Sequence, residues 1–223
     1  MSETAPAVTE PKIPSPTARK RKAFWTRQFY LWHWVSSALC LASMLFFAFT
    51  GITLNHAADI PAKPVVNERK LTLPAGLLGA VALEQGAAAE KKAPLPAPVA
   101  EWLGKELRQK VADRGADWSE FEIYLSLPRP GGDAWLTIDR ESGAVTHELT
   151  RRGVISYLND LHKGRHTGPG WAWFLDIFSG ACVIFSLTGL GLLWVHARRR
   201  PSTWPVVAAG VLVPVLIVIF LVH

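Results

Sequence analysis

Three long apolar stretches dominate the pattern of hydrophobic and polar positions along the chain. Residues 34–54 and 203–222 contain no charged side chain, and residues 171–195 contain only Asp176. Each stretch is long enough to cross the roughly 30 Å hydrocarbon core of a bilayer as a helix. The pattern therefore predicts three transmembrane helices, which we place at residues 29–56, 171–197 and 203–222.

The polar region between the first two apolar stretches has a different pattern. Residues 98–115 place apolar side chains at helical spacing, and the segments FEIYLSL, AWLTID and AVTHELT then alternate as strands do. The turns RPGGD and RESG separate them, so we expect a helix packed on a small antiparallel meander over residues 98–156. His147 alternates in phase with Val145 and Leu149, which predicts a buried structural histidine.

The remaining segments complete the expected architecture. Residues 57–97 are rich in Pro and Ala and predict mostly loop, while residues 157–170 form a short His- and Gly-rich segment at the membrane surface. Residues 1–28 read as a disordered basic tail. The predicted fold is an α-helical integral membrane protein with three transmembrane helices and a small α+β extracytoplasmic domain inserted between helices 1 and 2.

Basic residues indicate the orientation in the membrane. The net charge is +6, residues 1–33 carry six Lys or Arg against two Glu, and Arg198, Arg199 and Arg200 follow the second apolar stretch. Because Lys and Arg mark cytoplasmic segments, we expect a cytoplasmic N-terminus and an external sheet domain. The basic tail adjoins a membrane span, so it predicts contact with membrane lipid and no nucleic-acid binding.

Histidines gather at the predicted ends of the spans. His33 and His196 fall at the cytoplasmic surface, whereas His56, His162 and His166 fall at the outer surface. Imidazoles from two helices can bind haem iron axially, and ionisable groups at membrane depth tend to be functional. The pattern predicts one or two haem b groups, at most one at each surface, with all five histidines as candidate iron ligands. Glycines such as Gly51, Gly189 and Gly191 would either admit the macrocycle or only let the helices pack.

Other chemistry is open for some of these residues. His162 and His166 are four residues apart, which suits zinc, but the segment HKGRH lacks the Glu of a metalloprotease and a nearby third ligand. Asp176 would orient a ligating histidine, carry protons, or be satisfied by a neighbour. Arg165 would meet a haem propionate or anchor the chain at the membrane surface.

Four segments resemble a known family. They are FYLWHWVSSALCLASMLFFAFTGITLNH, LNDLHKGRHTGPGWAWFLDIFSG, SLTGLGLLWVHARR and WLTIDRESGAV. The chain resembles the PepSY-associated transmembrane proteins of bacterial inner membranes, which are related to ferric-siderophore reductases that carry haem on transmembrane histidines. The resemblance implies electron transfer toward a ferric siderophore or other ferric chelate in the periplasm. It carries the ligand role onto His33, His56, His162 and His196, with His166 as a further candidate.

The chain departs from the larger relatives in length, with three spans and one PepSY-like unit. Reductase activity would therefore require a homodimer or another inner-membrane subunit. His33 and His56 lie 23 residues apart, about 34 Å along a straight helix, which is long for electron tunnelling. The alternative is a non-catalytic, membrane-anchored PepSY module that binds or regulates a partner, with histidines that are only interfacial.

Overall fold

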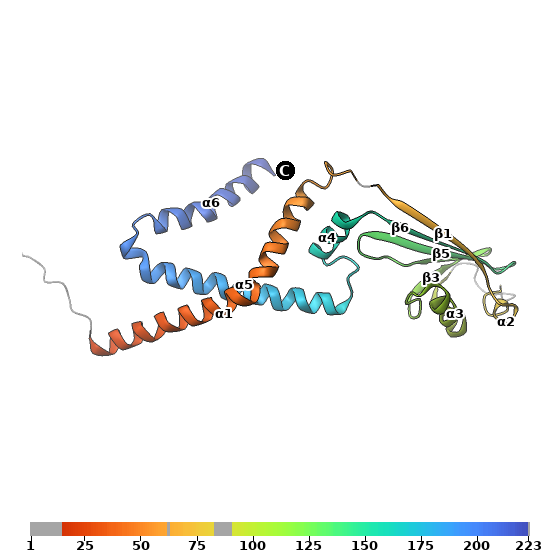
Figure 1. The fold of residues 1–223 in the computed structure, drawn as a ribbon, viewed down its shortest axis with the longest axis horizontal. Helices are drawn as coiled ribbons and strands as arrows, with labels where there is room; N and C mark the ends of the chain where they lie inside the picture. The colour runs from red at the N-terminus through yellow and green to blue at the C-terminus, as the bar shows by residue number, and fades with distance from the viewer. Residues whose placement is uncertain (1–14, 62, 83–90, 223) are drawn as a thin grey trace, which may run out of the picture. The chain divides into compact units, whose positions relative to one another are not determined.

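The chain divides into two compact units in a computed structural model that describes residues 15–61, 63–82 and 91–222. One unit is Met44–Leu175, which contains the sheet. The other contains the described residues up to Ser43 and those from Asp176 onward. In chain order, the sheet strands follow the first long helix and precede the second (Figure 1).

Three helices are long and apolar enough to cross a membrane. They are α1 (Pro16–Asn55), α5 (Pro169–His196), which a short 3-10 helix at Ala197–Arg199 extends, and α6 (Thr203–Leu221). The expectation of three apolar membrane-length helices is therefore confirmed.

The first helix begins well before the predicted position 29. Residues 16–28 are helical, where a disordered tail was expected, and residues 1–14 of that tail lie outside the described residues. Ala, Arg and Lys are strong helix formers, and Pro16 suits the first position of a helix. With 40 residues, α1 is about 60 Å long, roughly twice the hydrocarbon thickness.

The sheet is antiparallel and has six strands in the order β1-β6-β5-β4-β3-β2. The predicted meander corresponds to β4 (Glu122–Ser126), β5 (Gly132–Asp139) and β6 (Ala144–Arg151). Both edge strands come from the segment expected to be mostly loop, and a third unpredicted strand follows the main helix. These strands are β1 (Val65–Thr72), β2 (Lys91–Pro94) and β3 (Gly115–Trp118), with the short helix α2 (Ala75–Leu78) after β1.

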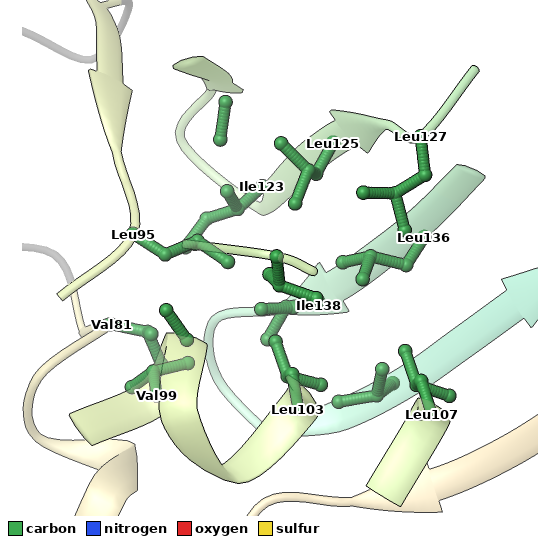
Figure 2. Close-up of a cluster of buried hydrophobic side chains, with 14 of the residues drawn as sticks. Val81, Leu95, Val99, Leu103, Leu107, Ile123, Leu125, Leu127, Leu136 and Ile138 are labelled. Carbon is green, nitrogen blue, oxygen red and sulfur yellow. The ribbon is translucent and has the colours of Figure 1, made fainter. Parts of the chain in front are cut away.

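The core lies between the sheet and α3 (Ala97–Leu107), which packs along one side of it (Figure 1). Figure 2 shows Leu103 of α3 directed toward Ile138 of β5, with further side chains of both layers around them. The alternation in the segment FEIYLSL predicts a buried Phe121, but this residue is 72% exposed and lies just before β4. The helix also ends at Leu107, well short of the predicted residue 115, because Arg108 adopts a left-handed conformation.

His147 is buried in this core, as its alternation predicted. It lies on β6 opposite Arg69 of β1 and Leu136 of β5, and only 3% of its surface is exposed. Neither ring nitrogen has a hydrogen-bond partner among the described residues. Burial, reinforced by the positive charge of Arg69, lowers the pKa of His147 below its usual value. The folded domain therefore holds this imidazole in its neutral form.

The buried imidazole predicts a stability that depends on pH. Because the pKa of His147 is lower when folded, the unfolded chain binds more protons in mild acid. The stabilisation is complete above the unfolded value of about 6.5 and is lost as the pH falls toward the folded pKa. In denaturant titrations followed by tryptophan fluorescence, His147→Leu should reduce the loss of stability between pH 7.5 and 5.5. The exposed His166→Leu should not, and equal pH dependence in both variants would contradict the assignment.

Candidate functional site: histidines on the long helices

His33 of α1 is oriented by two acceptors on α5. Its Nδ1 lies 3.2 Å from the Phe185 carbonyl oxygen and 3.2 Å from Thr188 Oγ1, and its ring stacks on Phe185 at 4.5 Å. Because a carbonyl oxygen can only accept, Nδ1 carries a proton, and in the neutral imidazole Nε2 then carries the lone pair. Nε2 of His33 has no hydrogen-bond partner in the described part of the chain.

His162 has an equivalent arrangement in the other unit. It ends helix α4 (Val154–His162), and its Nδ1 lies 2.7 Å from Thr50 Oγ1 of α1. The Thr50 hydroxyl donates its only proton to the Phe46 carbonyl oxygen at 2.9 Å, so it accepts from Nδ1 of His162. Nε2 of His162 therefore also holds a lone pair, and it too lacks a partner within residues 15–61, 63–82 and 91–222.

His196 and His56 share this tautomer but differ in what surrounds Nε2. His196 donates from Nδ1 to the Leu192 carbonyl oxygen at 2.8 Å, and its Nε2 accepts from the Tyr30 hydroxyl at 3.2 Å. His56 Nδ1 lies 3.2 Å from a carboxylate oxygen of Asp59, and its side chain is 58% exposed. All four histidines predicted as ligands thus have Nδ1 anchored, the arrangement typical of imidazoles that bind a metal through Nε2.

Glycines bring the helices into direct contact at the histidines. A Cβ atom at Gly189 would lie 3.3 Å from His33 Cε1, and one at Gly51 would lie 3.6 Å from His162 Cε1. At Gly191 a Cβ atom would come within 2.9 Å of the Phe29 ring. Side chains of the chain itself fill these contacts, so the glycines serve close packing and leave no slot for a macrocycle between the packed faces.

The histidines do not form opposed pairs. His56 directly follows the end of α1 and is exposed, as is Ile52 one turn earlier, whereas His162 contacts α1 at the buried Thr50. His33 lies beside Thr188, eight residues before His196, which is about 12 Å along α5. The residues therefore fit a haem as single ligands, through Nε2 of His33 and His162, and do not fit as ready-made pairs within one chain.

The remaining predicted residues stand apart from these contacts. The side chains of His166, Arg165 and Asp176 are exposed, and none hydrogen-bonds to another side chain among the described residues. His166 lies after α4 with a left-handed backbone, φ 57°. The described residues contain no cluster of three or more His, Cys, Asp or Glu side chains that could hold a metal ion.

Sequence reasoning missed the two threonines that orient the histidines. Thr50 is fully buried and Thr188 is 9% exposed, and each donates to a carbonyl oxygen of its own helix. A hydroxyl in an otherwise apolar span is the sequence signal, because such a group needs a partner at that depth. The signal points to a polar contact, but it does not identify the histidine on the other helix.

Helix α4 holds His162 in place through the two residues of the preceding turn. Asp160 Oδ2 accepts from the Gly131 backbone N–H at 2.8 Å, and Asn159 Oδ1 accepts from the Thr53 hydroxyl at 2.7 Å. Both residues are 7% exposed. Helix α4 is thereby fastened to the β4–β5 turn on one side and to α1 on the other.

Comparison with known proteins identifies one match. A family model described as putative PepSY_TM-like matches residues 24–223. No curated protein and no solved structure matches the chain.

The close approach of Gly131 to α4 gives a test of how His162 is positioned. Gly131 has φ 72°, and a Cβ atom there would lie 2.8 Å from the Tyr157 backbone. Gly131→Ala should therefore loosen α4 and speed amide hydrogen exchange across residues 154–162. Gly168→Ala is the control, since Gly168 has a similar φ of 80° but nothing within 4 Å of its added Cβ atom. Equal exchange rates in α4 for both variants would show that the contact does not hold the helix.

Proposed function

Because the chain belongs to the PepSY_TM-like family, we propose that it is a bacterial inner-membrane b-type haem protein. It passes electrons toward a ferric chelate, such as a ferric siderophore, on the outer side of the membrane. The basic residues of α1 and the 3-10 helix favour a cytoplasmic N-terminus and an external sheet domain, inserted between the first two spans.

The observation that carries the proposal is the shared tautomer of His33 and His162. Each donates its Nδ1 proton to an acceptor on another helix and keeps a free lone pair on Nε2. A histidine that only anchors a span at the membrane surface needs no such arrangement. A ligand does, because an Nδ1–H bond fixes the ring and increases the basicity of Nε2.

Different residues of the chain would bind the haem iron and orient its ligands. His33 and His162 would bind iron, and haem supplies reversible one-electron exchange when bound. Thr50 and Thr188 orient the two rings. His196 would have to release Tyr30 before it could bind iron, while His56 is exposed and accessible to another chain. A homodimer or a second inner-membrane subunit can thus complete the coordination.

Two exposed charged residues, Arg165 and Asp176, suit the proposed function. Arg165 is exposed between α4 and α5 and is available to a haem propionate or to an anionic ferric chelate. Asp176, exposed in the first half of α5, is available to accept a proton during reduction. Helix α4 links this region to the sheet, so a molecule bound by the domain can influence His162.

The absorption spectrum tests the proposal. The full-length chain, purified in detergent from cells with ample haem, should show a sharp reduced-minus-oxidised band and one or two haems per chain by pyridine haemochrome. His33→Ala and His162→Ala should each remove haem, whereas the matched control His166→Ala should retain it. A colourless wild-type chain would refute haem binding and favour the membrane-anchored binding module.

Thr50 provides a second test, since it acts only through His162. Thr50→Val keeps the shape but removes the acceptor of Nδ1, which should weaken haem retention at this site by about 10-fold or more. Thr50→Ser keeps the hydroxyl and should retain haem and its midpoint potential. A Val variant with unchanged haem content and potential would contradict the positioning role, and circular dichroism would check that the helices remain folded.

A further inference from the structure

A hollow of about 740 Å³ lies where the N-terminal extension of α1 meets the end of α5. From α1 it is lined by Arg21, Lys22, Trp25 and Phe29, which recur at helical spacing on one face. Trp194 and Arg198 line it from the end of α5 and the 3-10 helix that follows. The hollow thus combines three cations with three aromatic rings.

Within the described residues, the cations of the hollow have no acidic counterpart. The described residues of this unit contain one acidic residue, Asp176, which lies 22 residues from Arg198 near the other end of α5. None of the three cations forms an ion pair with a described residue. The described residues of the unit include eight Lys or Arg: Arg19, Lys20, Arg21, Lys22, Arg27, Arg198, Arg199 and Arg200. Uncompensated positive charge in a concave site favours an anionic ligand.

The position of the hollow along the membrane normal indicates which anion can reach it. Residues 34–54 of α1 account for the roughly 30 Å of hydrocarbon, so residues 16–33 extend beyond it. The contact between Phe29 and Gly191 borders the hollow on the membrane side. Trp25 and Trp194 are 53% and 68% exposed, as expected for aromatic residues at the level of lipid headgroups.

We propose that this hollow binds the phosphate headgroup of an anionic phospholipid of the cytoplasmic leaflet. The guanidinium groups of Arg21 and Arg198 and the ammonium group of Lys22 donate to the phosphate oxygens. The acyl chains lie along the apolar surface of α5 next to Trp194. Basic pockets between transmembrane helices on this side of a membrane commonly hold phospholipid headgroups. The site does not depend on haem.

Lipid retention by the full-length chain tests the site. The chain in mixed detergent micelles with equal phosphatidylglycerol and phosphatidylcholine is examined by native mass spectrometry. We expect wild type to retain phosphatidylglycerol preferentially, and Arg21→Gln/Arg198→Gln to lower that preference about 10-fold. The matched control Lys20→Gln/Arg199→Gln removes the same charge from residues that do not line the hollow, and it should keep the preference.

Two further arms separate specific lipid binding from its alternatives. Arg21→Lys/Arg198→Lys keeps the charge and should retain most of the preference for phosphatidylglycerol. This variant tests the site even if the Gln double variant does not fold. Inorganic phosphate at millimolar concentration should not displace the lipid. Displacement by phosphate would overturn the proposal in favour of a soluble phosphate ligand. An equal loss of lipid preference in the Gln test variant and the Gln control variant would also overturn it, because the attraction would then be nonspecific.

Discussion

The bonds made by one turn of helix α4 fix the position of His162. Asn159 bonds to Thr53 of α1, Asp160 bonds to the Gly131 turn of the sheet, and His162 bonds to Thr50. These bonds reach different elements, so the helix cannot rotate without breaking at least one. Leaving a buried polar group without its partner costs about 1–3 kcal/mol, which makes the arrangement stiff. The orientation of His162 is therefore tied to the sheet.

A threonine hydroxyl orients each of the two histidines whose Nε2 is free, His33 and His162. A threonine hydroxyl in an apolar helix donates its proton to a carbonyl oxygen of its own helix. Its oxygen can still accept a hydrogen bond from a neighbouring side chain. That hydrogen bond fixes the imidazole, and glycine lets the ring approach the other backbone. Because side chains fill the space between the packed helices, an atom that binds Nε2 must approach from outside the helix contact. In the proposed haem protein, each of these histidines would therefore be a single ligand, and a partner would complete the coordination.

Much of the fold could be predicted from local pattern, but the edges of the sheet could not. The apolar helices and the strands β4 to β6 repeat their hydrophobic positions, and burial enforces that repeat. Strand β1 has mostly exposed side chains, such as Val65 and Lys70, and pairs with β6 through its backbone, so no alternation marks it. The basic start of α1 was predicted to be a disordered tail because of its high charge, although its Ala, Lys and Arg residues are good helix formers.

The candidate site was only partly predictable, for a geometric reason. The sequence alone puts His33 just before the first apolar stretch and His162 before the second. The direction of a side chain around its helix follows from periodicity, and applying it would have put His56 with the exposed Phe49 and Ile52. The partners of the rings depend on how separate helices pack, which local pattern does not encode.

The central claim is that His33 and His162 present Nε2 to haem iron. Electron paramagnetic resonance of the oxidised, assembled protein tests this most directly, because one axial histidine leaves ferric haem high-spin, whereas a second histidine supplied by a partner copy makes it low-spin. The account predicts a low-spin ferric signal in the wild-type chain that disappears when both histidines are replaced by alanine. A low-spin signal that persists in the double variant, or no ferric haem signal in a chain supplied with haem, would contradict it.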